Sequence, residues 1–176
     1  MARRRRVPAW APADALLELD DDYAQVLSLL DRRTAFRAIL DRLPDEIGVD
    51  VAWIGELDQT GNIVLNHVVR ARTDAVNGLV VPPGIGLAAR VMETGRPQWV
   101  ANYPVSPGLI RPFSAHADRE GVKGMVAVPL VHAGRRLGVL YGADRTETGY
   151  SDVTVTALEA AAAQAANAAI VAERAR

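Results

Sequence analysis

The sequence has no cysteine, a single lysine (Lys123) and nine aromatic residues among 176. Without cysteine there can be no disulfide framework, no thiol nucleophile and no thiolate metal site. The chain also has no large excess of either charge, because it contains 20 basic and 21 acidic residues and its net charge is −1. Removing the four consecutive arginines Arg3–Arg6 takes the net charge from −1 to −5. A mildly acidic body argues against a nucleic-acid-binding surface.

Long apolar runs are missing as well. The alanine-rich tract near the C-terminus is interrupted by Gln164 and Asn167, so we expect no stretch of the roughly 18 apolar residues that span a membrane. Near the N-terminus the arginines are followed by proline-rich residues 7–12 instead of the apolar run of an export signal. We therefore expect residues 1–13 to be a flexible tail, and the protein to be cytoplasmic without a membrane span.

The patterns of hydrophobic residues predict a single α+β domain, which contains both helices and strands. The chain is 49% hydrophobic, which excludes disorder over most of its length, and its length favours a single core. Steps of three and four residues predict helices, and alternation predicts strands. The elements expected in chain order are helices 14–30 and 34–47, strands 51–57, 63–70 and 79–81, helix 84–95, strand 98–100, loop 101–113, helix 114–120, strands 124–131 and 137–143, and helix 152–174. Hairpins that do not alternate with long helices indicate an antiparallel sheet.

Three units follow from this order. Residues 1–13 form the tail, residues 14–33 an N-terminal signalling and dimerisation helix, and residues 34–176 a domain that ends in a long helix. Within the first hairpin, strict alternation places Ile63, Leu65, His67 and Val69 on one face of the sheet.

Four segments resemble a known family. They are the glycine-started helix and following Gly-Arg-Pro of residues 83–97, Met-Val-Ala-Val-Pro-Leu at 125–130, Gly-Arg-Arg-Leu-Gly-Val-Leu at 134–140, and Tyr-Ser-Asp with the closing helix at 150–166. In this order they resemble a GAF domain, the small-molecule sensing module of signalling proteins. The resemblance implies a central antiparallel sheet of five to six strands, with helices on one face and a lid loop and short helices on the other.

The resemblance also implies a role. We expect a non-catalytic sensory domain that binds a small molecule and regulates an output domain in an actinobacterial signalling protein. A sensor histidine kinase in a two-component system is the preferred parent, and a transcription regulator the second. The methionine sulfoxide reductases and bilin photoreceptors of the family depend on cysteine, which is absent here. The Asn-Lys-x-Phe-Asp-Glu signature of its cyclic-nucleotide-binding members is absent too. An alternative is a dimerisation module with a vestigial pocket.

A pocket is expected between the sheet and segment 99–121. Its candidate ligand-binding residues are Trp53, Trp99, Tyr103, Phe113, His116 and Met125, with Arg111 as the nearest cation. Aromatic side chains clustered on one lid segment favour an apolar cavity. Arg111 would hold an anionic group, although a solvated role fits it equally well.

His116 also raises two cofactor alternatives. Some GAF sensor kinases hold haem through a histidine in this region, so a haem-based gas or redox sensor is a second hypothesis. His116 and Glu120 lie four residues apart and could share a metal, but two ligands without a third are weak evidence, and a surface pair on the helix is the preferred interpretation.

A homodimer through the terminal helices is the last expectation. The 14–30 helix has a complete apolar stripe that the domain does not need, and such a stripe requires a cover. The closing helix carries small side chains at three- and four-residue spacing, namely Leu158, Ala161, Ala162, Ala165, Ala169 and Ala172. These stripes would pair across a two-fold axis, although packing of the second onto its own sheet is the alternative.

Overall fold

A computed structural model describes residues 32–105 and 114–174. Its centre is a six-stranded sheet in the order β3-β2-β1-β6-β5-β4, in which every neighbouring pair is antiparallel. The elements are α2 (Arg32–Ile47), β1 (Val51–Leu57), β2 (Ile63–Val69), β3 (Leu79–Val81), α3 (Gly86–Thr94), β4 (Gln98–Val100), the 3-10 helix η1 (Tyr103–Val105), α4 (Ser114–Glu120), β5 (Gly124–His132), β6 (Arg135–Asp144) and α5 (Asp152–Arg174). The expected α+β class and antiparallel sheet are confirmed.

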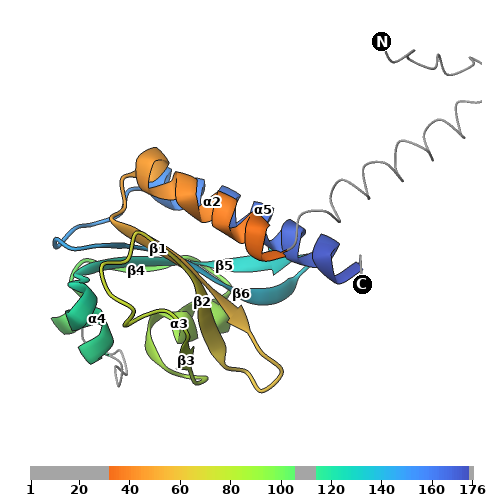
Figure 1. Ribbon diagram of the computed structural model, residues 1–176, viewed down its shortest axis with the longest axis horizontal. Coiled ribbons are helices and arrows are strands. Elements are labelled where there is room, and N and C mark those ends of the chain that lie inside the picture. The colour runs from red at the N-terminus through yellow and green to blue at the C-terminus, as the bar shows by residue number, and fades with distance from the viewer. Residues whose placement is uncertain (1–31, 106–113, 175–176) are drawn as a thin grey trace, which may run out of the picture.

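The helices divide between the two faces of the sheet. The long helices α2 and α5 lie together on one face, and the short helices α3 and α4 lie on the other (Figure 1). Each face has its own apolar core, one beneath α2 and α5 and one beneath α3 and α4. Since β1, β5 and β6 are buried on both faces, their side chains alternate between two cores instead of between core and solvent.

Helix α5 packs tightly because its inner face is made of small residues. Ala162, Ala165 and Ala166 are almost fully buried, and α5 contacts both β5 and α2. The stripe expected to pair with a second subunit is thus part of this chain's own core from Leu158 to Ala169. The sheet and α2 already cover these side chains, so the stripe packs within its own domain, as the alternative expects, and the homodimer itself stays a prediction.

Helix α5 is also long and apolar enough, by composition alone, to cross a membrane, contrary to the expectation from Gln164 and Asn167. Its buried side chains from Leu158 to Ile170 lie against the sheet and α2 of the same domain. The helix therefore packs as a core helix of its own domain, and core helices can pass the same test of length and composition.

The first hairpin contains an irregularity that changes the face of its side chains. Ile54 pairs with His67 and Gly55 pairs with Leu65, so Asn66 is an extra residue on β2. A bulge of this kind reverses the alternation beyond it. Leu65 belongs to the core beneath α3 and α4, whereas Val69 belongs to the core beneath α2 and α5. The prediction of one shared face for residues 63 to 69 is therefore wrong.

Residues 14–31 lie outside the described residues, and so do the N-terminal tail and the expected 14–30 helix. Helix α2 begins at Arg32, two residues before the expected start at Thr34, and continues through Pro44 to Ile47. The divisions at residues 13 and 33 stay predictions.

Candidate functional site

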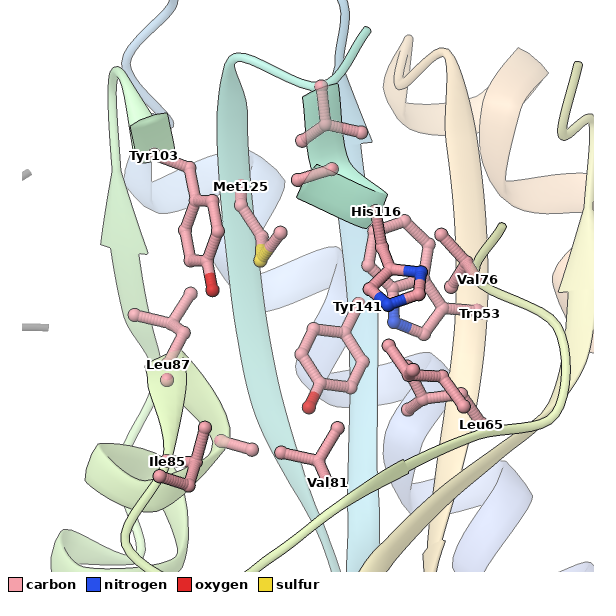
Figure 2. Close-up of a pocket in the computed structure, with 15 residues that line it drawn as sticks. Trp53, Leu65, Val76, Val81, Ile85, Leu87, Tyr103, His116, Met125 and Tyr141 are labelled. Carbon is pink, nitrogen blue, oxygen red and sulfur yellow. The ribbon is translucent and has the colours of Figure 1, made fainter. Parts of the chain in front are cut away.

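A pocket lies on the sheet face that α3 and α4 cover (Figure 2). Its volume is about 60 Å³. The residues that line it are Trp53, Leu65, Val76, Leu79, Val81, Ile85, Gly86, Leu87, Ala88, Tyr103, His116, Ala117, Val122, Met125 and Tyr141. They come from strands β1, β2, β3, β5 and β6, from α3, α4 and η1, and from the connections between them. The pocket is thus assembled from segments across the whole sheet.

The floor of the pocket is a pair of aromatic rings. Trp53 on β1 lies directly opposite Tyr141 on β6, and their rings stack at a centroid distance of 5.2 Å and an interplanar angle of 22°. Both side chains are buried. Aromatic pairs of this geometry stabilise neighbouring strands by roughly 0.5–1.5 kcal/mol beyond the area they bury. The sheet register therefore fixes the floor rigidly.

The walls come from the short elements above the floor. On α4, the His116 Nδ1 lies 3.1 Å from the Ala75 carbonyl oxygen, and because a carbonyl only accepts, Nδ1 carries the proton. Tyr103 reaches into the space from η1 on the opposite side (Figure 2). The backbone at Gly86 has φ +67°, and a Cβ there would lie 3.5 Å from the Tyr103 hydroxyl. A glycine at the start of α3 therefore suits both the turn and the approach of Tyr103.

The pocket is mostly apolar. Its described lining contains no aspartate, glutamate, lysine or arginine. Burial and the nearby Tyr103 raise the pKa of Tyr141 well above its ordinary value, so its hydroxyl stays protonated. Trp53 Nε1 is buried, and it has no hydrogen-bond partner within residues 32–105 and 114–174. An unmet buried donor costs about 1–3 kcal/mol.

A buried carboxylate fixes α4 over the pocket. Glu120, the last residue of α4, is 1% exposed. It accepts hydrogen bonds from the backbone N–H groups of Arg72 (2.7 Å) and Thr73 (3.0 Å) and from the Thr73 hydroxyl (2.7 Å). Arg145, immediately after β6, donates to the same carboxylate. Burial alone would raise the pKa of Glu120, but these hydrogen bonds outweigh it and lower the pKa.

Four of the seven predicted site residues line the pocket, namely Trp53, Tyr103, His116 and Met125. Trp99 does not. It pairs with Val126, whose side chain belongs to the core beneath α2 and α5, and its ring meets Tyr150 edge-on at 6.0 Å while remaining 48% exposed. Successive side chains of a strand point to opposite faces of the sheet, and Trp99 lies on the face that α2 and α5 cover, away from the pocket. Arg111 and Phe113 lie outside the described residues.

Neither interpretation of His116 and Glu120 as a pair is correct. His116 bonds to Ala75, whereas Glu120 is occupied by Arg72, Thr73 and Arg145. They are neither a metal pair nor a surface pair. Within the part of the chain that the structure describes, no group of three or more histidine and carboxylate side chains could hold a metal.

The pocket also does not fit haem. A histidine-ligated haem needs an open nitrogen and room for a large macrocycle. The space here is about 60 Å³, and its described lining holds no lysine or arginine to pair with the propionates. The haem hypothesis therefore has no geometric support among residues 32–105 and 114–174.

Comparison with known proteins agrees with the fold. Residues 30–169 match the sequence profile described as GAF domain. The HTH-type transcriptional activator RamA of Corynebacterium glutamicum is 30% identical over 132 residues, which are 72% of this chain and 47% of that protein. The chain thus spans about half the length of this curated relative.

Two solved structures share the architecture. The GAF domain of a phosphoenolpyruvate-protein phosphotransferase from Coxiella burnetii superposes with a TM-score of 0.72 at 19% identity, covering 93% of this chain and 97% of that one. A domain of a putative two-component sensor histidine kinase from Sinorhizobium meliloti gives 0.61 at 20% identity, covering 77% and 88%. At these identities the likeness concerns the fold.

Proposed function

Because this chain belongs to the GAF domain family, whose members are signalling and sensory modules, we propose that it senses a small molecule in the pocket beneath α3 and α4 and regulates an output domain without catalysing a reaction. The observation that carries the proposal is the pocket itself, which is lined mainly by apolar and aromatic side chains. Pockets with these properties are typical of small-molecule sites.

The contacts of α4 suggest how occupancy would reach the rest of the protein. Glu120 at the end of α4 binds Arg145, and the Arg145 backbone N–H donates to Asp50 at 2.8 Å. The neighbouring Asp144 accepts a hydrogen bond from Tyr150 at 2.9 Å, just before α5 begins. A ligand that favours one position of α4 would thereby bias the start of α5.

For the output we reverse the order expected from the sequence, which favours a histidine kinase over a transcription regulator. The relative at 30% identity is a transcriptional activator, whereas the kinase domain at 20% identity supports the fold alone. We therefore favour a cytoplasmic transcription regulator as the parent and keep the kinase as the second candidate.

A pocket-filling variant tests the proposal. Ala88 on α3 is 4% exposed and lines the pocket, so Ala88→Leu would occupy a space of about 60 Å³. Screening a library of neutral metabolites by thermal shift should give a compound that raises the melting temperature of the wild type by about 5–10 °C at 100 times its Kd. Ala88→Leu should abolish this shift.

Ala89→Leu is the matched control, because Ala89 is the next residue of α3 and does not line the pocket. It should retain the full shift. Compounds that stabilise the Ala88 and Ala89 variants equally would contradict the proposed site.

A homodimer is also proposed, but through the outer face of α5. Val153 is 80% exposed, and Thr156, Ala160, Ala163 and Asn167 are exposed at three- and four-residue spacing. Ala163→Arg should weaken self-association in sedimentation runs at several concentrations while the domain stays folded. Ala165→Glu, by contrast, places a charge in the core and should unfold the domain. A wild type that is monomeric at high micromolar concentration would contradict the dimer.

A further inference from the structure

The pocket contains a donor without an acceptor. The Trp53 side chain is only 3% exposed, and its Nε1 has no hydrogen-bond partner among the described residues. An indole N–H can only donate. In Figure 2 the Trp53 nitrogen lies on the ring edge turned toward the centre of the labelled residues. An acceptor brought by a ligand would remove the cost of this unmet donor.

Charge restricts what that ligand can be. A charged group in a buried site must be paired, and the described lining of this pocket contains no aspartate, glutamate, lysine or arginine. The neighbouring Tyr141 stays protonated and so contributes no negative charge. The nearest buried ion pair, Glu120 with Arg145, is already complete and does not line the pocket.

Volume restricts its size. A buried apolar cavity of about 150 Å³ accommodates benzene, which has six non-hydrogen atoms. The pocket here has about 60 Å³. By proportion, the buried part of the ligand has about two to three non-hydrogen atoms.

We propose, building on the proposed sensory function, that the pocket takes an uncharged small molecule, or the uncharged end of one, whose hydrogen-bond acceptor binds the Trp53 indole N–H while its apolar atoms lie against Tyr141 and Met125. Short ketones, aldehydes, esters and ethers have this chemistry. Carboxylates and amines do not.

Three probes of the same shape test the proposal. Acetone is uncharged and carries one acceptor, acetate adds a charge, and isobutene removes the acceptor. The readout is the indole N–H signal of Trp53 in a proton–nitrogen NMR spectrum of the full chain. The signal is assigned by its loss in Trp53→Phe, because the chain has two other tryptophans, Trp10 and Trp99.

Acetone should move the Trp53 signal downfield in a saturable manner, with a Kd in the millimolar range that is typical of tiny ligands. Acetate should leave the signal unchanged, and isobutene should bind without the downfield shift. Trp53→Phe should weaken acetone binding by roughly tenfold, measured from the amide signals of neighbouring residues. Trp99→Phe is the control, and its acetone affinity should equal that of the wild type.

Each other result overturns the inference. Acetate that binds as well as acetone would show that the site accepts charge. Equal affinities of acetone in the wild type and Trp53→Phe would show that the indole does not anchor the ligand. If no probe perturbs Trp53, the stated ligand class is wrong. The proposed sensory function survives all three results as long as the thermal shift depends on Ala88.

Discussion

Replacing Glu120 with glutamine is expected to lower the melting temperature by roughly 10 °C. One carboxylate oxygen accepts from the Arg72 N–H and from Arg145, and the other accepts from the N–H and the hydroxyl of Thr73. An amide in either orientation turns its NH₂ group toward a backbone N–H. It also leaves the mostly buried Arg145 without its counter-charge. Breaking a buried pair costs about 3–5 kcal/mol, and each kcal/mol lowers the melting temperature of a domain of this size by about 2–4 °C.

The pH dependence provides a second test of the same contact. Because the pKa of Glu120 is lowered in the folded state, its stabilisation is fully present above the ordinary value of 4.5 and is lost as the pH falls through the lowered value. The difference in stability between the wild type and Glu120→Gln should therefore be constant near neutral pH and should narrow in acid. Asp118→Asn is the control, since Asp118 is an exposed carboxylate on the same helix. A change of under 2 °C in Glu120→Gln would show that α4 is held by other contacts.

Gly138→Ala is expected to destabilise the domain by a similar amount. Gly138 lies on β6 opposite Glu56 of β1, and a Cβ there would lie 2.1 Å from the Gly55 carbonyl oxygen. The neighbouring atom belongs to the backbone, so no side-chain rotation can relieve the overlap. The two central strands would have to separate locally, which forfeits hydrogen bonds between them and opens the core. We expect the free energy of unfolding to fall by more than about 3 kcal/mol, which is the upper end of the range for overpacked cores.

The measurement is chemical denaturation followed by circular dichroism. The matched control is Gly149→Ala, because an added Cβ at Gly149 makes only an ordinary contact, 3.6 Å from the Trp99 ring. It should change the free energy of unfolding by less than about 0.5 kcal/mol. If Gly138→Ala were as stable as this control, the close approach of β1 and β6 would be wrong.

The elements of this fold could be predicted from periodicity because each segment has a strong local pattern. Helix α5 follows the prediction from Asp152 to Arg174, and β1 from Val51 to Leu57. Side-chain direction was harder to predict. Asn66 is the bulged residue of β2, and nothing in the sequence of β2 distinguishes it from a paired residue. The face on which His67 and Val69 lie can therefore be determined only from the pairing of β2 with β1.

The pocket residues, too, could be predicted only where they did not depend on strand pairing. Trp53, Tyr103, His116 and Met125 were found because aromatic and polarisable side chains in this region suggested a cavity. Tyr141 was missed, although its alternation within β6 and its pairing with Trp53 would have revealed it once the register was known. Trp99 was misplaced because a three-residue strand has too few side chains to define its faces. The Glu120 contacts could not be predicted, since they join residues 48, 47 and 25 positions away along the chain.

The Glu120 carboxylate also turns two loop amides into natural reporters. The N–H groups of Arg72 and Thr73 lie between β2 and β3, outside any strand, where exchange with solvent deuterium would ordinarily be fast. Because a buried side chain accepts both of them, they exchange only when the end of α4 moves away. Their exchange rates therefore measure the opening free energy of α4 in the unmodified protein, before and after a ligand is added.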